Sequence, residues 1–132
     1  MIDHDRNRQC PDCVGDIGQH LAIGPKLGMQ PGIDSPGFRC LRELVADSEI
    51  VSVKLCAYRN LLNAPDQEVG RAFHRALLEA DPGRLLWGSD WPHLRVTPVP
   101  DAAELLATMR RWTGDEQLTE RILVDNARAL YA

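Results

Sequence analysis

The chain has 132 residues, 44% of them hydrophobic, and a formal net charge of −4. This length and composition are typical of one globular domain with its own core. The acidic balance and the lack of any dense Lys/Arg cluster argue against nucleic acid or an anionic membrane surface as a partner. No apolar run approaches the roughly 18 residues of a membrane span, and the first residues do not resemble a signal peptide, so we expect a cytoplasmic protein.

The first 19 residues are polar and lack helical or strand periodicity, so they are predicted to form a loosely ordered lead-in to a domain of residues 20–132. Cys10 and Cys13 have the CxxC spacing of a zinc or redox pair. A zinc site needs further ligands, and a redox motif needs a strand before it and a helix after it, neither of which is evident. The alternative is two exposed thiols. Residues 20–23 are predicted to form a short strand.

A helix is predicted over residues 36–46. Ser35 can cap it, Pro36 suits its first turn, and apolar residues follow at helical spacing. Cys40 is expected to be buried in this helix as a small apolar side chain. Residues 50–55 contain β-branched side chains in partial alternation and predict a strand.

Three polar side chains, Lys54, Tyr58 and Arg59, lie at the carboxyl end of that predicted strand. A guanidinium there can hold a carboxylate through two parallel hydrogen bonds. The alternative is that Arg59 forms a surface ion pair with an acid such as Asp66. A helix of about fifteen residues follows, in which His74 is interpreted as a surface or helix-packing residue.

Residues 85–87 form a short apolar run that predicts a buried strand of a parallel sheet. Gly88 allows a close approach by its neighbours, and Pro92 ends the strand. Asp90 and His93 therefore follow its carboxyl end, where parallel α/β folds place their active sites. The alternative is that Asp90 caps the following turn and His93 lies on the surface.

Two helices are predicted at the end of the chain, one capped by Asp101 and one beginning near Asp115. Trp112 is expected to pack in the core. The alternation of strands and helices predicts an α/β fold with about three parallel strands, flanking helices and these two terminal helices. The open edge of such a sheet must be covered or paired with another chain.

Four stretches occur in this order: PGIDSPGF (31–38), VKLCAYR (53–59), GRLLWGSDWPH (83–93) and ILVDNARALY (122–131). Together they resemble the amidohydrolase-related family, barrel hydrolases that include 2-pyrone-4,6-dicarboxylate lactonases. The resemblance covers roughly residues 21–132 and implies the C-terminal portion of a (β/α)8 TIM barrel. A complete barrel of this kind needs about 250 residues.

The resemblance also implies a hydrolase in which water attacks a small carboxylated lactone or similar ring. Asp90 would be the general base, and His93 would orient it or donate to the leaving oxygen. Arg59 and Tyr58 would hold the substrate's carboxylate, and Lys54 would contribute charge.

The chain departs from the family pattern in its histidines, since residues 3–5 read Asp-His-Asp where an HxH pair is expected. A catalytic zinc needs about three protein ligands, which cannot be identified, so no metal cofactor is predicted although zinc occurs in the family. The missing groups would come from a second copy or from a complementing barrel chain. The alternative function is a truncated non-catalytic remnant or a subunit completed by another chain.

Overall fold

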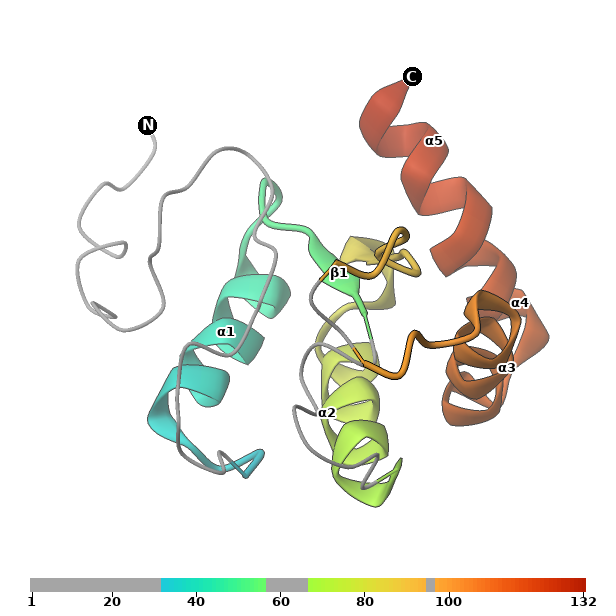
Figure 1. The fold of residues 1–132 in the computed structure, drawn as a ribbon. Coiled ribbons are helices and arrows are strands. Elements are labelled where there is room, and N and C mark those ends of the chain that lie inside the picture. Colours follow the sequence, from blue (N-terminus) through green and yellow to red (C-terminus); the bar gives the residue numbers. More distant parts are fainter. Residues whose placement is uncertain (1–31, 57–66, 95–96) are drawn as a thin grey trace.

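The computed structural model describes residues 32–56, 67–94 and 97–132 (Figure 1). The predicted lead-in with Cys10 and Cys13, and the short strand predicted at residues 20–23, lie outside these ranges. The elements follow in the order α1 (Pro36–Asp47), β1 (Val53–Leu55), α2 (Gln67–Ala80), η2 (Pro82–Arg84), β2 (Leu85–Trp87), α3 (Ala102–Thr113), α4 (Glu116–Glu120), η3 (Arg121–Asp125) and α5 (Asn126–Tyr131).

Strands β1 and β2 pair in parallel, with Val53 opposite Leu85. Parallel neighbours need a long crossover connection, and α2 supplies it. The strand predicted over residues 50–55 was too long, because only residues 53–55 join the sheet. The side chain of Ile50 is exposed, and the backbone N–H of Ile50 donates to the Ser48 hydroxyl at 3.3 Å. Ile50 therefore belongs to the connection after α1 and not to the strand.

Helix α1 begins at Pro36 as predicted and buries Leu41 and Val45, which are four residues apart on one face. Two details of the prediction were wrong. Ser35 has the extended backbone of an N-cap, but its hydroxyl makes no capping hydrogen bond. Cys40 is only half-buried, because it lies beside the buried stripe rather than on it.

The core lies where the helices meet the two strands. Helix α2 contacts both α1 and α3, and Figure 1 shows it between them. His74 on α2 is buried, which confirms a helix-packing histidine, and Trp112 on α3 is buried as predicted. The core cluster consists of Leu41, Val45, Val53, Leu55, Leu77, Leu85, Met109 and Ile122.

The two terminal helices also agree with the prediction. The Asp101 carboxylate accepts hydrogen bonds from the first N–H groups of α3, and the Asp115 carboxylate accepts one from the N–H of Leu118. Gly114 ends α3 with a left-handed φ of 68°, which glycine adopts readily. The second helix is continuous through α4, η3 and α5, with one π-helical turn in its middle.

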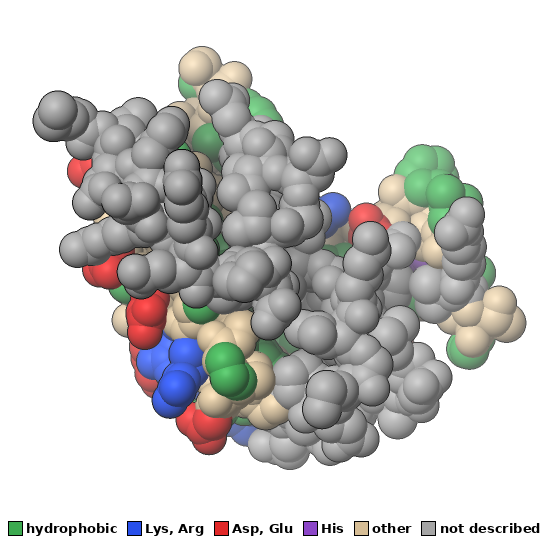
Figure 2. All heavy atoms as spheres, turned by 90° about the vertical axis from the view of Figure 1, so that its left-hand side faces the viewer, with side chains coloured by type: hydrophobic (Ala, Val, Ile, Leu, Met, Phe, Trp, Pro, Cys, Tyr) green, Lys and Arg blue, Asp and Glu red, His purple; other side chains and the backbone are tan. Residues whose placement is uncertain are grey.

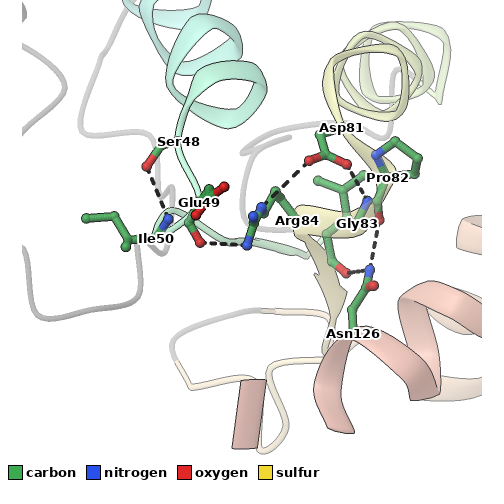
Figure 3. Close-up of polar contacts among 9 residues, drawn as sticks. Ser48, Glu49, Ile50, Asp81, Pro82, Gly83, Arg84 and Asn126 are labelled. Carbon is green, nitrogen blue, oxygen red and sulfur yellow. Dashed lines mark hydrogen bonds and ion pairs between the residues drawn. The ribbon is translucent and has the colours of Figure 1, made fainter. Parts of the chain in front are cut away.

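A polar network fixes the amino end of β2 (Figure 3). The Asn126 side-chain amide of α5 donates to the carbonyls of Pro82 at 2.8 Å and Leu85 at 2.7 Å. The Arg84 guanidinium donates to the carbonyl of Glu49 at 2.6 Å. These contacts connect the last helix and the end of α1 to the start of the strand. None of these contacts involves the carboxyl end of β2.

Candidate active site

A tight turn follows the carboxyl end of β2. The N–H of His93 donates to the Asp90 carbonyl at 2.9 Å, and the Trp91–Pro92 peptide bond within the turn is cis. Asp90 and His93 both have left-handed backbones, with φ of 62° and 57°. Residues other than glycine rarely adopt this backbone conformation, and those that do cluster at functional sites.

The Asp90 carboxylate lies beside the end of the neighbouring strand. Lys54 of β1 donates from Nζ to Asp90 Oδ1 at 3.3 Å. The two side chains are 41% and 26% exposed, so the pair is partly shielded from solvent but remains open to a small molecule. The parallel register brings them together, because Lys54 lies near the carboxyl end of β1 and Asp90 follows the carboxyl end of the neighbouring β2.

His93 is buried, with 3% of its surface exposed. The alternative of a surface histidine is therefore wrong. Within the turn, the backbone carbonyl of Asp90 accepts the N–H of His93. Trp91 and Leu94 of the same segment are exposed.

Tyr58 and Arg59 lie outside the described residues. The last residue of β1 is Leu55, and its carbonyl accepts a hydrogen bond from the N–H of Gly88 at 3.2 Å. Both strands thus end at one level. The contribution of Tyr58 and Arg59 to substrate binding stays a prediction.

Within the residues that the structure describes, no group of three or more His, Cys, Asp or Glu side chains is arranged to hold a metal ion. These residues alone do not supply a metal centre. In the same part of the chain, no helix is long and apolar enough to cross a membrane.

A separate hollow of about 390 Å³ lies between α1 and α2, lined by Arg39, Arg42, Glu43, Ala46, Glu79 and Ala80. Figure 2 shows the face that lies to the left in Figure 1, where basic and acidic side chains of the described residues lie intermixed. This hollow contains no strand end, and its charges are of both signs. The carboxyl end of β1 and β2 is therefore the better candidate for chemistry.

The pairing of Lys54 with Asp90 was missed by sequence reasoning, which assigned Lys54 to the substrate. Opposite charges at the ends of two successive strands were the available signal, because neighbouring parallel strands bring their carboxyl ends together. The sequence predicted that Gly88 allows a close approach but did not identify the neighbour. In the structure this neighbour is the side chain of Lys54.

This arrangement, a β-α-β unit with an acid and a cation at the carboxyl end of its strands, is characteristic of α/β enzymes. The profile of the amidohydrolase family matches residues 3–132. The chain belongs to this family.

Three relatives illustrate the likeness. A 4-sulfomuconolactone hydrolase from Rhizobium radiobacter is 37% identical over 105 residues, which are 76% of this chain and 34% of that protein. A 2-pyrone-4,6-dicarboxylate hydrolase from Comamonas testosteroni is 29% identical over 76% of this chain and 36% of its own length. A crystal structure of an Agrobacterium tumefaciens protein in its apo form superposes with a TM-score of 0.64 at 31% identity, covering 74% of this chain and 35% of the other.

The chain thus spans about one third of the length of the curated relatives that it matches. Its α/β arrangement corresponds to part of the Agrobacterium tumefaciens structure.

Proposed function

We propose that this chain carries the catalytic carboxylate of an amidohydrolase-family lactone hydrolase, with Asp90 as the general base. The observation that supports this most is the position of Asp90, in a left-handed turn at the carboxyl end of β2 and 3.3 Å from the Lys54 ammonium. A nearby cation favours the ionised form of a carboxylate, and the ionised form is the one that can accept a proton.

In the proposed reaction, a water molecule attacks the lactone carbonyl carbon while the Asp90 carboxylate takes one of its protons. The carbonyl oxygen gains negative charge, the carbonyl then re-forms as the bond from its carbon to the ring oxygen breaks, and the ring oxygen takes back the proton held by Asp90. The product is the ring-opened hydroxy acid or its keto tautomer. His93, buried under the turn, would position Asp90 through the backbone hydrogen bond that closes the turn.

The proposed substrate class is a small lactone with an additional anionic group. The relatives named above act on 4-sulfomuconolactone and on 2-pyrone-4,6-dicarboxylate, both of which are acidic lactones. Tyr58 and Arg59 lie three and four residues after the end of β1 in the sequence, and we propose that they hold the acidic group. A guanidinium suits this role because it binds a carboxylate or sulfonate through parallel hydrogen bonds.

A second candidate is a subunit whose site is completed by another chain, or a remnant without catalysis. It is favoured by the sheet, which has two strands among the described residues, whereas the complete barrel of the family has eight. In this case the polarising groups for the carbonyl would come from a second copy or from a complementing barrel chain.

The test is hydrolysis of 2-pyrone-4,6-dicarboxylate and 4-sulfomuconolactone by the purified chain, followed through the loss of lactone absorbance. Asp90→Asn should lower kcat by about 10² to 10⁴, the usual contribution of a general base. Glu116→Gln is the matched control, because it removes an exposed ion pair to Arg110 on the helices. No turnover of either lactone by a folded wild-type chain would contradict the proposal for this chain alone and favour the second candidate.

A further inference from the structure

The side chain of Lys54 passes close to Gly88 on its way to the Asp90 carboxylate. A Cβ atom built on Gly88 would lie 3.2 Å from Cδ of Lys54, 3.4 Å from Cε and 3.6 Å from Nζ. A contact of 3.2 Å is tighter than nine in ten real Cβ contacts, so with an alanine at position 88 the lysine chain would have to move by a few tenths of an ångström. The aliphatic part of Lys54 therefore packs against the position that a side chain of residue 88 would occupy.

Backbone conformation does not explain this glycine. Gly114 is the glycine with a positive φ among the described residues, so Gly88 has a backbone that alanine can adopt. Its N–H makes an ordinary sheet hydrogen bond to the carbonyl of Leu55. A side chain at position 88 would instead crowd the chain of Lys54.

We infer that Gly88 and Lys54 act together as positioning residues for Asp90. Gly88 leaves room for the lysine chain to cross from β1 to β2, and the Lys54 ammonium then fixes the carboxylate and favours its ionised form. This inference rests on the proposed function, in which Asp90 is the base. It assigns the charge of Lys54 to that base, whereas the sequence had suggested the substrate.

The arrangement has a chemical consequence. A carboxylate on a left-handed turn can rotate about its side-chain bonds, and a base is effective only when its lone pair points at the water. One charge-assisted hydrogen bond from the neighbouring strand restricts that rotation. Because Lys54 is still 41% exposed, its other N–H groups remain accessible to solvent or substrate.

The experiment is an NMR titration of the Asp90 side-chain carboxyl carbon, assigned by its loss in Asp90→Asn, so it needs no turnover. In Lys54→Met the midpoint should move to higher pH, because the cation is gone. In Gly88→Ala it should move in the same direction by a smaller amount, since the methyl group shifts the lysine chain without removing its charge. Lys54→Arg should stay nearer to wild type than Lys54→Met.

The matched control is Gly32→Ala, where the nearest atom of the described residues to an added Cβ is the Asp34 nitrogen at 4.0 Å, and its Asp90 titration should equal that of wild type. Circular dichroism establishes that each variant is folded. A wild-type Asp90 midpoint in folded Gly88→Ala or Lys54→Met would overturn the inference. Shifted midpoints in a chain that hydrolyses neither lactone would support the positioning contact and count against the proposed function alone.

Discussion

His74 should make the stability of the fold depend on pH. This side chain on α2 is 4% exposed, and its Nε2 lies 2.8 Å from the Thr113 hydroxyl of α3. That hydroxyl donates its single hydrogen to the Met109 carbonyl at 2.9 Å, so Nε2 of His74 is the donor in the contact with Thr113. Burial lowers the pKa of His74 from 6.5 to about 4, because the charged ring would lose its hydration.

The sign and size of the effect follow from proton linkage. Between the two pKa values the unfolded state binds more protons than the folded state, so the free energy of unfolding falls as the pH falls through this window. The stabilisation from a neutral His74 is complete above the unfolded pKa of 6.5 and is lost progressively down to about 4. Between pH 7 and pH 5 the loss is about 2 kcal/mol.

The assay is urea unfolding followed by circular dichroism at pH 7 and pH 5, on wild type and His74→Gln. Glutamine keeps a donor for Thr113 and does not titrate, so the other ionisable groups cancel in the comparison. The free energy of unfolding should fall about 2 kcal/mol more in wild type than in His74→Gln. An equal fall in both proteins would refute the argument that His74 is buried and neutral.

Three further predictions concern the fold and are each measured by urea unfolding. Leu85→Ala should lower the free energy of unfolding by about 2 to 5 kcal/mol, because the fully buried side chain leaves a cavity in the core. A loss below about 1 kcal/mol would contradict this. Asp101→Ala should cost about 1 kcal/mol through its two capping hydrogen bonds, whereas Ser35→Ala should cost much less because its hydroxyl caps nothing; equal losses would contradict the difference. Asn126→Ala should cost about 1 to 3 kcal/mol by removing two hydrogen bonds at the start of β2, and an unchanged stability would refute that role.

The helices could be predicted closely because their signals are local. The acids at 101 and 115 act on N–H groups two or three residues away, and the apolar stripe that includes Leu41 and Val45 needs only helical periodicity. Ser35 shows the limit of this approach. A residue suited to capping has the required backbone, but its hydroxyl rotamer depends on surroundings that sequence does not define.

The site could be predicted only in part, because its contacts join residues far apart in the chain. The position of Asp90 after a strand follows from the apolar run before it, and the structure agrees. The pairing with Lys54 spans 36 residues and depends on the register of β1 and β2, for which short strands carry little information. The burial of His93 likewise depends on how the turn folds back, which its sequence neighbours do not reveal.

The central claim, that Asp90 is the base of a lactone hydrolase, is tested most directly by Asp90→Gly with added formate. Glycine accepts the φ of 62° at this position, so the variant removes the carboxylate without straining the turn. Wild type should open the lactone, Asp90→Gly should be slower by about 10² or more, and formate should restore part of the rate in Asp90→Gly alone. Turnover by Asp90→Gly at the wild-type rate would contradict the claim.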